Sequence, residues 1–137
     1  MEYRILRVDD DSRIRQVLRD ILEAHADMAV IGEAVDGVEA VSMAADLRPD
    51  VILMDVQMPR MDGIQATTII KALQPEITVI GVSANDSPRV KEEMKEAGAA
   101  TLLPKGALTE ELYDAIVTHG GGPRPAAPLE RPSRRTE

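Results

Sequence analysis

The chain has 137 residues, of which 44% are hydrophobic and 29% are charged, and its formal net charge is −8. This size and composition predict one globular domain with a single core, and they exclude a disordered chain and a membrane protein. The chain has no cysteine, so disulfides and cysteine-ligated metals are excluded. Because it has only two histidines, any bound metal is expected to have oxygen ligands.

The hydropathy and charge patterns also bear on location and partners. The longest apolar runs, such as residues 51–54, fall far short of the roughly 20 residues that span a bilayer, and no signal-peptide pattern opens the chain. We therefore expect a cytoplasmic protein without membrane contact. The acidic balance argues against direct nucleic-acid binding by the folded part, because phosphate contacts need clustered Lys and Arg.

Short β-rich runs alternate with longer stretches of helical apolar spacing, which predicts an α/β fold with a parallel sheet. The expected strands are residues 4–8, 28–34, 51–54, 78–82 and 101–103. The third is apolar throughout, as is typical of a central strand covered on both faces. Helices are expected after each strand. Their boundaries come from Asp11 or Ser12 as the first N-cap, Pro49 after the second helix, Gly98 after the fourth, and Thr109 near the start of the fifth.

Two further structural expectations come from composition. The second expected helix follows residues 36–37, and its apolar residues at helical spacing are Val38, Val41, Ala45 and Leu47. Residues 1–119 form the expected domain. Residues 120–137 are rich in Gly, Pro and Arg, so we expect a flexible tail or linker there, in preference to a basic arm that binds nucleic acid.

Reactive residue types collect at the ends of four expected strands. Asp9 and Asp10 close the first strand, Asp55 follows the third, Ser83 the fourth, and Lys105 the fifth. Because ligands of open parallel sheets bind at the carboxyl ends of the strands, these side chains are expected to form one site. Clustered carboxylates need a compensating cation, and the all-oxygen donor set favours Mg²⁺. Such a site suits phosphoryl transfer with a carboxylate nucleophile.

Each of these residues also has an ordinary explanation when it is taken alone. The acidic residues 9–11 are typical of a helix cap, Asp55 of a turn, and Lys105 of an exposed surface. Ser83 alone indicates nothing. Only their combined placement at strand ends favours a functional site.

The combined motifs resemble the receiver domains of two-component response regulators, the CheY-like superfamily, over residues 3–119. The resemblance rests on Val8-Asp9-Asp10, on the run from Asp55 to Gly63 that reads DVQMPRMDG, on Val82-Ser83-Ala84, and on Pro104-Lys105-Gly106. It implies a flavodoxin-like (βα)5 fold with a doubly wound parallel sheet in strand order 2-1-3-4-5. It also implies a phosphorylatable signalling domain, which catalyses only its own phosphorylation and slow dephosphorylation.

The resemblance assigns a role to each site residue. Asp55 is the phosphoacceptor, and its expected donor is the phosphohistidine of a sensor histidine kinase or phosphotransfer protein. Mg²⁺, with Mn²⁺ as an alternative, is expected on Asp10, Asp55 and the backbone carbonyl of Gln57, with Asp9 acting through water. Lys105 and Ser83 are expected to contact the phosphoryl oxygens. An output domain beyond the C-terminus and a phosphorylation-dependent homodimer are further expected partners.

Several positions are expected to tune the switch or depart from the family pattern. Leu102 stands where the family commonly has an aromatic residue that moves with the hydroxyl of the fourth strand. Gln57, Ala84 and Asn85 occupy positions expected to influence switching and the lifetime of the phosphoryl group. Arg7 stands where the family has an apolar residue, and we expect it to reach an acidic neighbour such as Asp11 or the open end of the strand.

Two other classes of function remain as alternatives. One is a Mg²⁺-dependent phosphatase similar to the dehalogenase-like enzymes, because residues 9–11 contain the Asp-x-Asp spacing, although no sizeable cap insertion is present. The other is an interaction module that kept the fold and lost the switch, for which Leu102 and Arg7 are the only support. The sequence does not identify the kinase, the pathway or the output.

Overall fold

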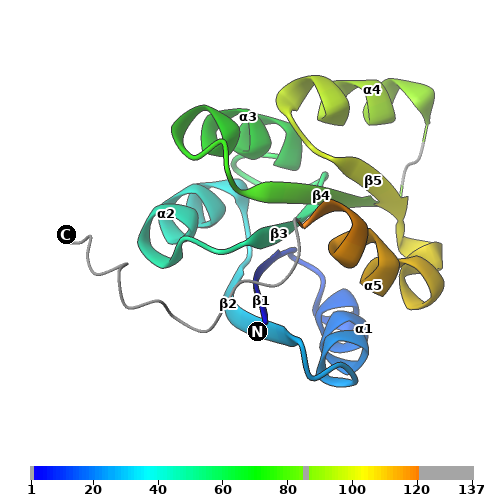
Figure 1. Cartoon of the computed structure of the whole chain (residues 1–137). Coiled ribbons are helices and arrows are strands. Elements are labelled where there is room, and N and C mark those ends of the chain that lie inside the picture. The colour runs from blue at the N-terminus through cyan, green and yellow to red at the C-terminus, as the bar shows by residue number, and fades with distance from the viewer. Residues whose placement is uncertain (1, 85–86, 121–137) are drawn as a thin grey trace.

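The computed structural model describes residues 2–84 and 87–120, and it places five parallel strands in one sheet of order β2-β1-β3-β4-β5 (Figure 1). The strands are β1 (Tyr3–Val8), β2 (Met28–Ala34), β3 (Val51–Asp55), β4 (Thr78–Ser83) and β5 (Thr101–Pro104). The helices are α1 (Ser12–Glu23), α2 (Gly37–Leu47), α3 (Gly63–Leu73), α4 (Pro88–Ala97) and α5 (Leu108–His119), with a 3-10 turn η1 (Lys105–Ala107) before α5. The predicted fold and strand order are therefore confirmed.

The tail predicted for residues 120–137 is described only at residue 120, because residues 121–137 lie outside the described part of the chain. In the part of the chain that is described, no helix has the length and apolar character needed to cross a membrane.

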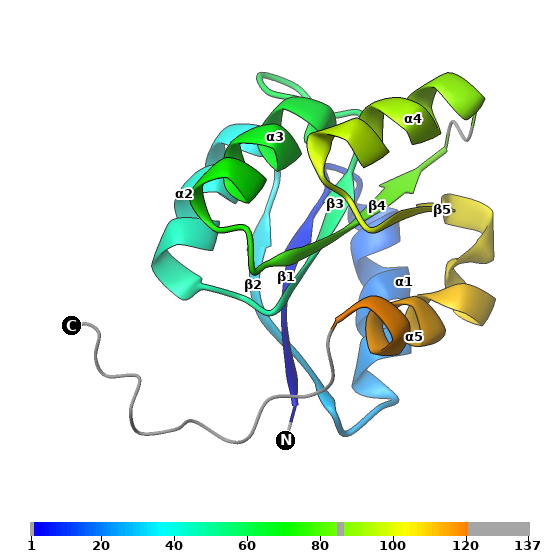
Figure 2. The same ribbon diagram turned by 45° about the horizontal axis from the view of Figure 1, so that its top comes forward.

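Helices cover both faces of the sheet (Figures 1 and 2). One core cluster lies under α1 and α5, and the other lies under α2, α3 and α4. The central strand β3 contributes to both, because Leu53 belongs to the first cluster while Ile52 and Met54 belong to the second. All five residues of β3 are buried, which explains its uninterrupted apolar run.

Capping residues set the helix boundaries. Asp11, Asp36 and Asp62 are the N-caps of α1, α2 and α3, and each accepts a hydrogen bond from a backbone amide of the first turn. Gly98 ends α4 in the left-handed conformation, as predicted. Helix α2 ends before Pro49, whose ring disfavours helical geometry in the residue that precedes it.

Only some of the apolar residues of α2 face the core. Val38 is 45% exposed and Ala45 is exposed, whereas Ala40 and Ala44 are completely buried. Val41 and Leu47 pack against the core. The buried stripe runs through small residues because α2 lies close to β2 and α3, where a larger side chain would hold the helix away.

Strand register aligns the carboxyl ends of the strands. Val8 of β1 is level with Met54 of β3, Asp55 is level with Val82 of β4, and Ser83 is level with Pro104 of β5. The residues that follow these positions therefore emerge at one edge of the sheet, which we call the carboxyl rim.

The start of α3 lies against the backbone at the end of β3. The Gly63 amide donates to the Val56 carbonyl at 2.8 Å, and a Cβ on Gly63 would overlap the Asp55 carbonyl oxygen and lie 2.9 Å from the Cα of Val56. Only a residue without a side chain fits this approach, so Gly63 fixes how α3 leaves the carboxyl rim.

We predict that Gly63→Ala destabilises the fold by about 1–3 kcal/mol, because backbone must shift to admit the methyl group. The measurement is the free energy of unfolding from urea denaturation. Gly106→Ala is the matched control, since a Cβ at Gly106 meets nothing within 4 Å. Equal stability of the two variants would show that the close approach at Gly63 carries no cost.

Candidate functional site

Asp55 is the last residue of β3 and lies at the centre of the carboxyl rim. Its side chain is buried with 2% exposure, and its Oδ2 lies 3.5 Å from the Nζ of Lys105. The Gln57 amide donates to its Oδ1 at 3.3 Å. Lys105 begins the turn after β5, so this pair joins the ends of two strands that are not neighbours in the sheet.

Asp9 and Asp10 follow β1, beside Asp55. The Asp9 side chain is buried, and its Oδ1 accepts the amide of Asp11 at 2.9 Å, whereas Asp10 is exposed. Because Val8 pairs with Met54 in the sheet register, Asp9 and Asp10 follow β1 at the same rim as Asp55. The structure thus pairs Asp55 with Lys105 and brings Asp9 and Asp10 to the same rim.

Of the remaining predicted residues, Ser83, Ala84 and Leu102 lie in or directly after β4 and β5. Ser83 ends β4 and is fully buried, Ala84 is exposed, and Asn85 lies outside the described residues. Leu102 is half-buried on the face covered by α4, where its Cδ1 lies 2.7 Å from the point that a Cβ on Gly81 would occupy. Leu102 thus fills the space above Gly81 with an aliphatic side chain.

The electrostatics of the rim favour protonation of Asp55. Burial raises its pKa to about 6, and the charges of Asp10 and Asp9 act in the same direction. Lys105 and the Gln57 amide oppose this shift. Burial likewise raises the pKa of Asp9, against the hydrogen bond from Asp11 and the charge of Arg7.

The oxygen donors of the rim suit a hard cation. Among the described residues, Oδ2 of Asp9 and Oδ2 of Asp55 are buried and accept no hydrogen bond, so each has a lone pair available for a positive charge. In the same part of the chain, no group of three or more His, Cys, Asp or Glu side chains is arranged to hold a metal ion. Mg²⁺ does not need such a group, because it typically takes one or two carboxylates and keeps several waters.

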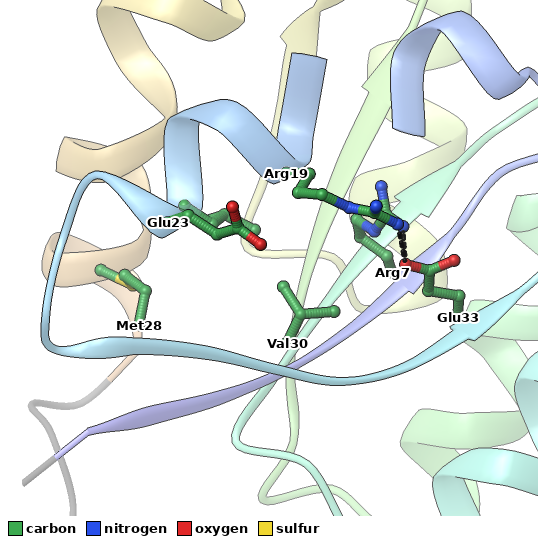
Figure 3. A pocket seen from close by; sticks show the side chains of 7 residues that line it. Arg7, Arg19, Glu23, Met28, Val30 and Glu33 are labelled. Atoms are coloured by element: carbon green, nitrogen blue, oxygen red, sulfur yellow. Dashed lines mark hydrogen bonds and ion pairs between the residues drawn. The ribbon is translucent and has the colours of Figure 1, made fainter. Parts of the chain in front are cut away.

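Arg7 differs from its neighbours in β1 because it is a charged residue with 1% exposure (Figure 3). Its guanidinium forms an ion pair with Glu33 of β2 and donates through Nη1 to the carbonyl of Arg15 in α1. Arg19 also pairs with Glu33, at 3.2 Å. The acidic partner of Arg7 is thus Glu33 and not Asp11, which pairs instead with the exposed Arg13.

This ion-pair group lines a cavity of about 290 Å³ between α1 and β2 (Figure 3). The cavity wall also includes Leu22, Met28 and Val30. The Glu33 carboxylate pairs with the guanidinium groups of both Arg7 and Arg19. The buried charge of Arg7 is therefore already compensated within the chain.

Sequence reasoning missed a contact between Arg60 and Asp36. Arg60 lies in the loop after β3, and its Nε and Nη2 reach the Asp36 Oδ2 at 2.9 and 2.6 Å. Beside this pair, the amide of Gly37 donates to the carbonyl of Met61 at 3.0 Å. The sequence offered no signal for it, because Asp36-Gly37 is explained by helix capping and Arg60 by an exposed loop.

Comparison with known proteins identifies the family. Residues 5–117 match the family model described as the response regulator receiver domain. Among curated relatives, a protein-glutamate methylesterase/protein-glutamine glutaminase of Alkalilimnicola ehrlichii is 37% identical across 98% of this chain. The alignment covers 39% of that protein, and the chain likewise spans about half or less of the length of two other curated relatives.

Solved structures of response regulators also match this chain. The response regulator domain of Thermotoga maritima CheB is 33% identical, with a TM-score of 0.81 over 88% of this chain and 98% of that one. A CheX-CheY-BeF3-Mg+2 complex from Borrelia burgdorferi matches with 25% identity and a TM-score of 0.79, over 85% of this chain and 87% of that one. The sheet order, the acidic rim and the match over residues 5–117 together show that this chain belongs to the response regulator receiver domain family.

Proposed function

We propose that this chain is a phosphoacceptor in which Asp55 takes a phosphoryl group from the phosphohistidine of a sensor histidine kinase or phosphotransfer protein. The observation that carries the proposal is the buried Asp55 carboxylate at the end of the central strand, with the Lys105 ammonium 3.5 Å from its Oδ2. That oxygen accepts no hydrogen bond from the described residues, so its lone pairs are available to a phosphorus atom.

The transfer balances with the groups at the rim. An Asp55 oxygen forms a bond to phosphorus while the bond from phosphorus to the imidazole nitrogen breaks, and the electron pair of that bond returns to the ring. In this proposal Lys105 holds a fixed positive charge beside the new phosphoryl group, and the Ser83 hydroxyl donates to one of its oxygens. The chain acts only on itself in this scheme, so it is a signalling domain and not an enzyme that turns over a diffusing substrate.

A divalent cation fits beside Asp55. We propose that Asp10, Asp55 and the backbone carbonyl of Gln57 hold Mg²⁺, with Asp9 acting through water and Mn²⁺ as an alternative ion. The buried oxygens of Asp9 and Asp55 support this assignment, as does the Mg²⁺ named in the related CheY complex. When bound, Mg²⁺ neutralises charge on the transferred phosphoryl oxygens.

The output of the switch is a further part of the proposal. The curated relatives include methylesterases and transcriptional regulators, and all extend well beyond the matched region. We propose that phosphorylation in the cytoplasm changes contacts with an output domain, a partner or a second copy, starting from Ser83 and Ala84. Leu102 is packed above Gly81 on the same side, so it can repack when β4 moves. The family match favours this scheme over a dehalogenase-like phosphatase.

We predict that acetyl phosphate with Mg²⁺ adds one phosphoryl group to the wild-type chain, as measured by intact mass. Asp55→Asn removes the nucleophilic carboxylate and abolishes the adduct, whereas Asp46→Asn, which changes an exposed residue of α2, leaves it intact. EDTA also blocks the adduct. An unmodified wild type, or an equal adduct on Asp55→Asn, contradicts the proposal and leaves the interaction module as the better interpretation.

The raised pKa of Asp55 gives a second prediction, for the protein in EDTA. The unfolded carboxyl titrates near 3.8 and the folded one near 6, so the folded state binds the extra proton between these values. Stability therefore falls as the pH rises from about 4 to 6, because a buried charge forms. The Asp55→Asn variant has a neutral side chain, so it does not show this loss of stability between pH 4 and 6.

Thermal unfolding of wild type and Asp55→Asn from pH 4 to 8 tests this sign. We expect the variant to unfold at a higher temperature at pH 7.5, with the difference shrinking as the pH falls toward 4. A variant that is less stable than wild type at pH 7.5 would show that ionised Asp55 stabilises the metal-free fold.

A further inference from the structure

The loop of residues 56–62 connects the phosphoacceptor to α3 and contains Gln57, whose carbonyl is a proposed ligand of Mg²⁺. Its first residue is held by the Val56 amide, which donates to the Val82 carbonyl at 3.1 Å, and its last residue, Asp62, caps α3. The middle of the loop needs other contacts to hold one conformation, because carbonyl coordination of Mg²⁺ demands near-ideal geometry.

The middle of the loop is tied to the start of α2. The Arg60 guanidinium reaches the Asp36 carboxylate through Nε and Nη2, and the Asp36 side chain is only 6% exposed. Asp36 cannot follow the loop if it moves, because its Oδ1 accepts the amide of Glu39 as the N-cap of α2. The Gly37 amide adds a hydrogen bond to the Met61 carbonyl, and a Cβ on Gly37 would overlap that carbonyl.

Arg60 also has an unusual backbone conformation. Its φ is +66°, in the left-handed region where a side chain other than Gly or Asn carries a steric cost. Among the described residues, the hydrogen bond and ion pair of the Arg60 side chain are both made to Asp36, and they favour the conformation that carries this cost. Residues held in such conformations by their surroundings cluster at functional sites.

We infer that Arg60 is a positioning residue of the metal site, which clamps the loop of residues 56–62 to Asp36 and so fixes the Gln57 carbonyl. This inference rests on the proposed function, because it concerns the site where Mg²⁺ is expected. Arg60 touches neither the metal nor the phosphoryl group in this scheme. Its contribution passes through the backbone of Pro59, Met58 and Gln57.

The sign of the effect separates positioning from simple electrostatics. Removing a positive charge near an acidic site strengthens Mg²⁺ binding if charge alone matters. Loosening the loop weakens Mg²⁺ binding, because the carbonyl ligand must then be ordered when the ion binds. A weaker site after loss of Arg60 is therefore not explained by charge.

The experiment is a titration of the whole chain with MgCl₂, followed by amide chemical shifts of residues 55–57 in NMR spectra. We expect Arg60→Ala to raise the Kd for Mg²⁺ by about fivefold, through loss of the ion pair and retention of the left-handed strain. Arg60→Asn, which tolerates that conformation, should raise it less. Arg89→Ala is the matched control, since Arg89 is 87% exposed and pairs only with Glu93 in α4 among the described ion pairs.

Asp36→Asn completes a double-mutant cycle, because Asn still caps α2 but lacks the charge that holds Arg60. We expect Asp36→Asn to weaken Mg²⁺ binding, and the double variant to bind Mg²⁺ no more weakly than Arg60→Ala alone. Hydrogen exchange of the Gly37 amide, which needs no metal, should accelerate in each clamp variant as its bond to Met61 loosens.

The outcomes are distinguishable. If wild type binds Mg²⁺ and Arg60→Ala binds it as tightly as Arg89→Ala or more tightly, the clamp has no positioning role and only this inference fails. If wild type binds no Mg²⁺ and forms no phosphoryl adduct, the proposed function fails with it. Additive effects of Asp36→Asn and Arg60→Ala on the Kd would also overturn the inference, since the two residues would then act separately.

Discussion

The ionisation of Asp55 is the constraint on which the rest of the carboxyl rim depends. Its carboxylate is buried at the end of the central strand, where desolvation and the acidic residues after β1 raise its pKa to about 6. Lys105 is the cation that opposes this shift within the chain. The negative charge of the rim is incompletely compensated, since Oδ2 of Asp9 and Oδ2 of Asp55 accept no hydrogen bond from the described residues. In the proposed function, a divalent cation and a phosphoryl group supply the missing compensation.

The parallel sheet explains why these groups meet. Strand register brings the ends of β1, β3, β4 and β5 to one rim, although the residues that follow them are dispersed over nearly a hundred positions of sequence. Close backbone approaches at Gly37 and Gly63 then direct the connecting segments, because a side chain at either position would overlap neighbouring backbone. The scaffold thereby holds reactive side chains on short loops whose ends are fixed.

Two arginines show how charge supports this scaffold in different ways. Arg7 is buried beneath α1, where it forms an ion pair with Glu33 and donates to the Arg15 carbonyl, so it links β1, β2 and α1. Removing one partner from such a group leaves a buried charge without compensation, which is costly. Arg60 is largely exposed, yet its partner Asp36 is buried and fixed by capping. Its importance comes from the conformation that it holds and not from the strength of an exposed ion pair.

Local sequence patterns were enough to predict the α/β class, the five strands to within a residue or two, and the residues at the strand ends. These features are local, because apolar periodicity, capping residues and proline positions act within a few residues. The family resemblance supplied the strand order, which the sheet confirms.

Which side chains pack together and which charges pair depends on the folded arrangement of the helices and strands. Val38 is exposed while Ala40 is buried, because the closeness of α2 to its neighbours selects small residues. Arg7 pairs with Glu33, and Arg60 with Asp36, across 26 and 24 positions of sequence. No local pattern predicts such pairs, since a long charged side chain can reach any opposite charge that the fold brings within range.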